Sequence, residues 1–253
     1  MAAPAEIGIA AALGAMIGSF LNVVIHRVPL KVSLVHPGSR CTSCEAHIAA
    51  YDNVPVISWL LLRGRCRRCS ARISPRYPAV ELLTAIAFAA VVAVRGFDND
   101  LVLELPLVAC LIALAGIDLD HMLLPNRIVY PMAAFGLVTT AIVDRGDLVE
   151  HVVAGAGAFL FLLAAVLAYP RGMGMGDVKL AGAMGLYLGL SIVPVMLVAF
   201  LSGTVVGLGI IAREGAAARK KAVPFGVFLA LGGIVGVLAG PELIELYEDR
   251  FLG

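Results

Sequence analysis

The fold class is decided between residues 178 and 212, which read VKLAGAMGLYLGLSIVPVMLVAFLSGTVVGLGIIA and carry one charged side chain, Lys179. One straight helix of this length would measure roughly 50 Å at about 1.5 Å per residue. The hydrocarbon core of a bilayer is only about 30 Å thick. We therefore predict that the stretch folds back near residues 190–194 and crosses a membrane as two short spans.

Six further apolar runs are long enough to cross a bilayer, which takes about 17–25 residues. They lie near residues 7–25, 79–94, 101–117, 128–143, 152–169 and 223–239. Of the 253 residues, 60% are hydrophobic and 15% are charged. This composition argues against a soluble enzyme and excludes a disordered chain or a coiled coil. The predicted fold class is an all-α polytopic membrane protein with about eight transmembrane helices.

The Lys and Arg residues lie mostly on one side of this topology. Sixteen of the 19 fall in or beside the loops after the first, third, fifth and seventh spans, and only Arg95, Arg145 and Arg250 fall on the other side. The positive-inside rule places the richer side in the cytoplasm and both termini outside it. The start of the chain, Met-Ala-Ala-Pro-Ala-Glu, lacks the basic region of a signal peptide, so we expect the first run to remain a span.

The loop between the first two spans, residues 27–78, is a small Arg-rich insertion that contains four of the five cysteines. Cys41-Thr-Ser-Cys44 and Cys66-Arg-Arg-Cys69 are separated by 21 residues. This spacing is typical of a four-thiolate zinc site. A redox pair and disulfides remain alternatives, although a cytoplasmic location disfavours stable disulfides. We predict a structural zinc ion that supplies much of the folding energy of the insertion.

The basic residues also bear on possible partners. The Arg-rich insertion is suited to anionic headgroups of membrane lipids. We expect no nucleic-acid binding, because the basic residues follow the membrane topology rather than an exposed stripe. Cys110 lies in the middle of a span and is interpreted as a small apolar filler.

Two acidic clusters lie at the predicted cytoplasmic ends of spans. GIDLDHMLLPN at 116–126 contains Asp118 and Asp120, and GMGMGDVK at 172–179 contains Asp177. Two spans separate the clusters, so they share one face. Two carboxylates held close at a low-dielectric boundary share a proton, so that one activates water while the other polarises a carbonyl. Taken alone, these residues also fit solvated helix ends or a proton-coupled transporter.

Five sequence motifs in a fixed order run from residue 18 to residue 228. They are GSFLNVVIHRVP at 18–29, a cysteine region at 41–84 that includes DNVPVISW at 52–59 and RYPAVELL at 76–83, Ile117-Asp118 through Leu124-Pro125, GMGDVK at 174–179, and PFGVF at 224–228. Together they resemble the bifunctional type IV prepilin peptidases, the leader peptidase/N-methyltransferases. Two positions depart from the family pattern, Cys-Thr-Ser-Cys in place of Cys-Pro-x-Cys and Asn126 in place of a frequent Asp, and neither removes a presumed ligand or catalytic group.

The resemblance implies an aspartic protease at the cytoplasmic face of the bacterial cytoplasmic (inner) membrane. Such enzymes remove the short basic leader from type IV prepilins and pseudopilins after a glycine, and then methylate the new N-terminal amine with S-adenosylmethionine. Catalysis would belong to Asp118 and Asp177, with Asp120 as the competitor for the first role. The implied parts are a first span at 1–26, a cysteine (zinc) domain linked to N-methylation at 27–78, and a polytopic peptidase domain at 79–253.

Five other residues are candidates for substrate binding or support: Asn22, Glu81, Gly174, Gly176 and Lys179. Asn22 is expected to hydrogen bond between helices, and the glycines to let the backbone approach a ligand. Lys179 would orient the charge of Asp177 or extend to the interface. The chain has no glycine-rich dinucleotide-type loop after a strand, so the methyltransferase assignment depends on the resemblance. The alternatives are a peptidase without methylation, and an ion-coupled transporter or assembly protein that uses the Asp pair.

Overall fold

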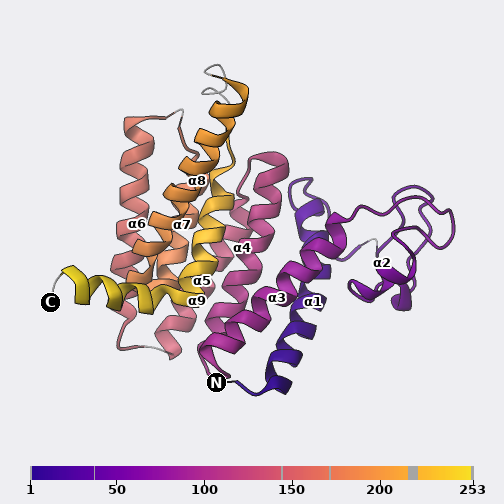
Figure 1. The fold of residues 1–253 in the computed structure, drawn as a ribbon, viewed down its shortest axis with the longest axis horizontal. Coiled ribbons are helices and arrows are strands. Elements are labelled where there is room, and N and C mark those ends of the chain that lie inside the picture. The colour runs from indigo at the N-terminus through magenta and orange to yellow at the C-terminus, as the bar shows by residue number, and fades with distance from the viewer. Residues whose placement is uncertain (1, 37, 144, 171, 216–221, 252–253) are drawn as a thin grey trace. The chain divides into compact units, whose positions relative to one another are not determined.

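The computed structural model describes residues 2–36, 38–143, 145–170, 172–215 and 222–251, and these form helices, turns and two isolated β-bridges. The prediction of an all-α chain is confirmed for these residues (Figure 1). Four basic residues used in the topology argument, Arg171, Arg219, Lys220 and Lys221, lie outside them. The elements are α1 (Pro4–Arg27), η1 (Ala50–Asp52), α2 (Ile57–Leu61), α3 (Arg76–Arg95), α4 (Leu101–His121), α5 (Asn126–Val143), α6 (Leu148–Ala168), α7 (Met175–Leu188), η2 (Gly189–Ser191), α8 (Ile192–Glu214) and α9 (Phe225–Phe251).

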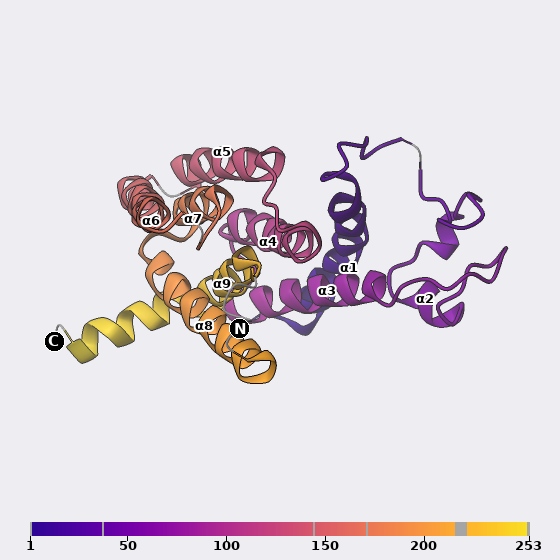
Figure 2. The same cartoon turned by 90° about the horizontal axis from the view of Figure 1, so that it is seen from above.

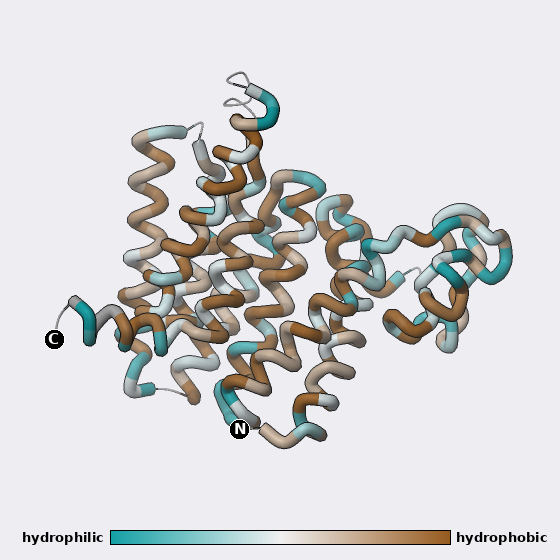
Figure 3. The backbone as a smooth tube through the Cα atoms, viewed as in Figure 1, coloured by the Kyte–Doolittle hydropathy of each residue, from teal (hydrophilic) through white to brown (hydrophobic). Residues whose placement is uncertain are grey.

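Seven helical stretches among the described residues are long and apolar enough to cross a membrane, against the eight predicted. Figure 3 shows that hydrophobic residues predominate along these helices. One of the seven, Met175–Glu214, has 40 residues and contains α7, η2 and α8. The sequence predicts two spans here, but α7 has only 14 residues and is about 21 Å long, which is too short to cross a bilayer by itself. The stretch is therefore counted once.

The predicted reversal inside this stretch is present. A Cβ atom built on Gly176, in the first turn of α7, would lie 2.9 Å from Leu124, and one on Gly226, at the start of α9, would lie 3.0 Å from the same side chain. Ser191, between α7 and α8, lies instead beside Gly240, which is just past the middle of α9. Phe200, further along α8, is again close to the start of α9. The chain therefore runs away from the start of α9 along α7 and returns along α8.

The chain divides into two compact units, Met1–Phe97 and Asp98–Gly253. In the first unit α1 packs along α3. A Cβ on Gly14 would lie 2.6 Å from the Thr84 carbonyl oxygen, and one on Gly18 would lie 2.7 Å from Glu81 Cα. Small residues four positions apart let two helix backbones approach closely. The first unit therefore includes α3 and continues past residue 78, the predicted end of the cysteine domain. The assignment of functions to 1–26, 27–78 and 79–253 stays a prediction.

In the second unit α7 contacts α4, α5, α6 and α9, while α8 packs on α9 (Figure 2). Side chains of α4 and α7, among them Leu111, Leu114, Leu180 and Met184, are fully buried. The helices that carry Asp118 and Asp177 are therefore core helices of this unit. The last helix, α9, contains Pro241, which accounts for a bend in its C-terminal part (Figure 1).

Candidate active site and metal centre

Asp118 and Asp177 are buried at the ends of two core helices. Asp118 lies in the last turn of α4 and is 5% exposed, whereas its competitor Asp120, two residues later, is exposed. Asp177 lies in the first turn of α7, is 7% exposed, and accepts the N–H of Gly174 with Oδ2 at 3.0 Å. A carboxylate in this position satisfies one of the unpaired N–H groups at the helix start. Burial thus favours Asp118 over Asp120 as the partner of Asp177.

The structure places the two carboxyl groups near one another. They are close enough for the charge of Asp118 to act on Asp177. Leu124 lies at the junction of the helices that carry them, since both Gly176 of α7 and Gly226 of α9 pack against its side chain. The end of α4 and the starts of α7 and α9 therefore meet at one point, as the shared face of the two acidic clusters predicts.

The start of α9 faces Asp118. The backbone N–H groups of Gly226 and Val227 lie near its carboxyl group. A Cβ on Gly226 would lie 2.8 Å from Asp118 Oδ2, so only glycine fits there without movement. This oxygen is buried and has no hydrogen bond of good geometry within the part of the chain that the structure describes. First-turn N–H groups carry the positive end of the helix dipole, which stabilises a negative charge on Asp118.

The PFGVF motif at 224–228 resembles the last-span motif of the family, and the sequence predicts no role for it. The signal that was available is Pro224 followed by an aromatic residue and a glycine, because proline favours a helix start and glycine permits close approach.

The other candidates on α7 have packing roles in the structure. Gly174 is the N-cap residue, and Gly176 lies against Leu124. Lys179 donates a hydrogen bond from Nζ to Asn126 Oδ1 at 3.2 Å, and its Nζ lies 5.4 Å from the centre of the Tyr130 ring. Lys179 therefore links α7 to α5, with an amide oxygen where the family often provides a carboxylate.

Asn22 and Glu81 lie in the first unit. Asn22 donates from Nδ2 to the Tyr77 carbonyl oxygen at 3.0 Å, which is an interhelical hydrogen bond from α1 to α3. Glu81 is buried and accepts the N–H of Val56 with Oε2 at 2.7 Å. Glu81 thus connects α3 to the insertion.

Val56 has an unusual backbone that sequence reasoning did not anticipate. Its φ is 60° and its ψ is −50°, and the N–H of Ile57 bonds to the Pro55 carbonyl oxygen. This is a γ-turn of the rare positive-φ kind, and a positive φ is seldom found in a β-branched residue. The buried Glu81 carboxyl group therefore holds a strained turn at the base of the insertion.

The four cysteines of the two pairs form one cluster. Their sulfur atoms all lie within 4.8 Å of one another, and Cys41 Sγ is 3.8 Å from Cys69 Sγ. The thiols are free rather than bridged. A tetrahedral zinc ion with Zn–S bonds of about 2.3 Å requires sulfur atoms about 3.8 Å apart. The donor set and its spacing fit a closed structural zinc site.

The two Cys-x-x-Cys turns have the same conformation. The N–H of Cys41 bonds to the Ala46 carbonyl oxygen at 3.0 Å, and the N–H of Cys66 bonds to that of Ala71 at 2.9 Å. Glu45 and Ser70, which directly follow the second cysteine of each pair, have φ angles of 55° and 58°. Backbone N–H groups of Cys44 and then Ser43 lower the pKa of the Cys41 thiol to about 6, which favours the thiolate that a metal ion binds.

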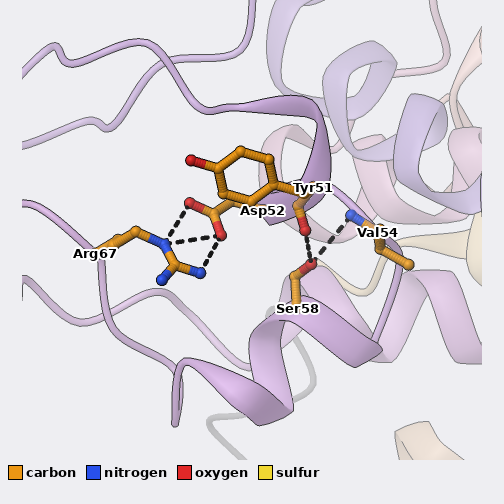
Figure 4. Close-up of polar contacts among 5 residues, drawn as sticks. All are labelled: Tyr51, Asp52, Val54, Ser58 and Arg67. Carbon is orange, nitrogen blue, oxygen red and sulfur yellow. Dashed lines mark hydrogen bonds and ion pairs between the residues drawn. The ribbon is translucent and has the colours of Figure 1, made fainter.

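Polar contacts hold the second cysteine turn against η1 (Figure 4). Arg67 donates from Nη2 and Nε to the Asp52 carboxylate at 2.6 and 2.9 Å, and its guanidinium lies 5.6 Å from the centre of the Tyr51 ring. Hydrogen bonds from Arg67 hold the pKa of Asp52 below its usual range. Ser58 donates to the Tyr51 carbonyl oxygen and accepts the N–H of Val54.

Comparison with known proteins places this arrangement in a family. Residues 12–95 match the bacterial peptidase A24 N-terminal domain, and residues 105–211 match the type IV leader peptidase family. A prepilin leader peptidase/N-methyltransferase of Aeromonas hydrophila is 37% identical over 94% of this chain and 92% of its own length. A type 4 prepilin-like proteins leader peptide-processing enzyme of Escherichia coli O78:H11 is 37% identical over 92% of this chain and 94% of its own length. No solved structure matches. The chain belongs to the type IV leader peptidase family.

Proposed function

We propose that this protein is an inner-membrane prepilin peptidase and N-methyltransferase whose catalytic residues are Asp118 and Asp177. It cleaves the leader from type IV prepilins or pseudopilins and methylates the new N-terminal amine, with S-adenosylmethionine as the methyl donor. The membership of the family supports both activities. The observation that carries the assignment of residues is the approach of two buried aspartates from α4 and α7, one of them facing the start of α9.

The pair would hydrolyse the peptide bond in two steps. The ionised carboxylate removes a proton from water as the water oxygen bonds to the scissile carbonyl carbon, while the protonated carboxyl group gives its proton to the carbonyl oxygen. The tetrahedral intermediate then collapses, the C–N bond breaks, and the amine leaves with a proton from the dyad. No acyl-enzyme forms. The first-turn N–H groups of α9 stabilise the charge on Asp118 when it acts as the base.

The insertion at 27–78 is proposed to serve the methylation step. Cys41, Cys44, Cys66 and Cys69 would hold a zinc ion that stabilises its fold and takes no part in the chemistry. The excess of Lys and Arg supports a cytoplasmic location for this insertion and for the dyad, with both termini on the opposite side. The proposed partners are prepilin-like substrates and membrane lipids.

The test is intact mass spectrometry of a prepilin incubated with purified protein, with and without S-adenosylmethionine. The wild type should remove the leader and add a donor-dependent methyl group, whereas Asp118→Asn and Asp177→Asn should each abolish cleavage. Asp120→Asn is the matched control, because it makes the same change on the same helix at an exposed position, and it should cleave normally.

Full cleavage by either dyad variant would contradict the assignment. Cleavage without the methyl shift would leave a peptidase alone. Failure of the folded, zinc-loaded wild type on several prepilins would favour an ion-coupled transporter or assembly protein.

A further inference from the structure

Helix α2 of the insertion has an apolar face that the described residues leave exposed. Ile57, Leu60 and Leu61 are 56%, 61% and 78% exposed. The opposite face packs inward: Ser58 is buried, and Trp59 donates from Nε1 to the Ile73 carbonyl oxygen at 3.2 Å. Three large aliphatic side chains on one short helix are costly to leave in water, at about 25 cal/mol per Å² of apolar surface. Their exposure points to an apolar environment outside the protein.

The start of α2 is held at a defined level of a membrane helix. Val56 is its N-cap residue, and the N–H of Val56 bonds to Glu81 Oε2. Glu81 lies five residues after Arg76, the first residue of α3, which is about 7.5 Å along the helix axis. Because α3 is a candidate membrane span that begins at Arg76, this level lies within the first two turns of the span, at the end expected near the membrane surface. A helix fixed there lies within the depth of the headgroup and acyl boundary.

The charges around α2 complement an anionic surface. Residues 38–75 contain six arginines and only two acidic residues, one of which, Asp52, is paired with Arg67. The other five arginines are Arg40, Arg63, Arg65, Arg68 and Arg72, and four of these follow α2 within about ten residues. Arg63, Arg65, Arg68 and Arg72 are all exposed. Apolar side chains beside a cluster of arginines are typical of interfacial helices on anionic membranes.

We propose that α2 is an interfacial membrane anchor. Ile57, Leu60 and Leu61 insert between the lipid headgroups and the acyl chains, and the neighbouring arginines bind anionic headgroups. Together with the Glu81–Val56 hydrogen bond, this contact fixes the height of the cysteine cluster above the bilayer. The proposal requires a membrane and does not depend on the proposed enzymatic activity.

Trp59 provides the test, because it lies in α2 and is the one tryptophan of the chain. Full-length protein would be reconstituted in vesicles whose acyl chains carry bromine near the headgroup or near the bilayer centre, with either anionic or zwitterionic headgroups. We expect bromine near the headgroup to quench Trp59 emission more than bromine at the centre, and more in anionic than in zwitterionic vesicles. Acrylamide from the aqueous phase should quench weakly.

A double variant, Leu60→Gln with Leu61→Gln, should lose most of the quenching by brominated lipid while it keeps its zinc content, which reports an intact insertion. Val35→Gln is the matched control, since Val35 is 72% exposed in the same unit but lies outside α2, and it should leave quenching unchanged.

Three results would overturn the proposal. The first is strong quenching by acrylamide with none from brominated lipid. The second is unchanged lipid quenching in the double variant. The third is protection of Trp59 that develops only when a prepilin is added, which would make α2 a substrate-binding surface. Equal quenching in anionic and zwitterionic vesicles would overturn the role of the arginines.

Discussion

The contact between α9 and Asp118 makes Gly226→Ala a sensitive test of the proposed site. The added Cβ would lie 2.8 Å from Asp118 Oδ2, and ordinary contact begins at 3.4 Å, so the carboxylate or the helix must move by about 0.6 Å. Misplacing a catalytic group by about 1 Å can lower a rate about 100-fold. We therefore expect leader cleavage to slow by about 10- to 100-fold, which is about 1.4–2.7 kcal/mol in the activation barrier.

The assay is the single-turnover rate of leader removal, with thermal unfolding measured on the same preparations. Gly207→Ala is the matched control: it makes the same change in α8, where a Cβ would have nothing within 4 Å. Alanine favours a helix over glycine by about 1 kcal/mol, so neither change should unfold the protein. A normal cleavage rate for a folded Gly226→Ala protein would refute the packing of α9 on Asp118. An equal loss in Gly207→Ala would show that the effect comes from stiffening any helix.

Two further predictions concern the insertion. The purified protein should contain about one zinc ion per chain, and Cys44→Ser should lower this content. After chelation, trypsin should cleave within residues 38–75 earlier than it cleaves within the second unit, as peptide mapping would show. Glu81→Ala should leave the Val56 N–H without its acceptor and lower the free energy of unfolding by about 1–3 kcal/mol, measured by thermal unfolding, whereas Glu81→Gln keeps an acceptor and should recover most of the loss. Equal melting temperatures for the Ala and Gln variants would contradict this role for Glu81.

Much of the membrane fold follows from the sequence because each span is a local property. The apolar runs predict α1, α3 to α6 and the start of α9, and the excess length of 178–212 predicts the break between α7 and α8. That Asp118 and Asp177 share one face also follows, because an even number of spans between two clusters returns the chain to the same side. The same reasoning does not predict which helices lie next to either aspartate on that face. The order of helices around α7 is set by packing between distant parts of the chain.

The start of α9 illustrates this limit. Gly226 follows Asp118 by more than a hundred residues, and its closeness to Oδ2 depends on how α4 and α9 pack, which no local pattern reports. The glycine itself was visible in PFGVF, yet a glycine near a helix start has many uses. Its role becomes specific only when the carboxylate that it accommodates is in place.

Val56 shows a conflict between local and distant preferences. Its β-branched side chain favours an extended backbone, whereas the structure holds it at φ 60°. Such strain costs about 1–3 kcal/mol and persists only where the surroundings impose it. At Val56 the constraint comes from Glu81 of α3, which accepts the Val56 N–H and lies outside the insertion at 27–78. An excised peptide of residues 27–78 would lack this acceptor, so the geometry of the cysteine insertion depends on the membrane helix that follows it.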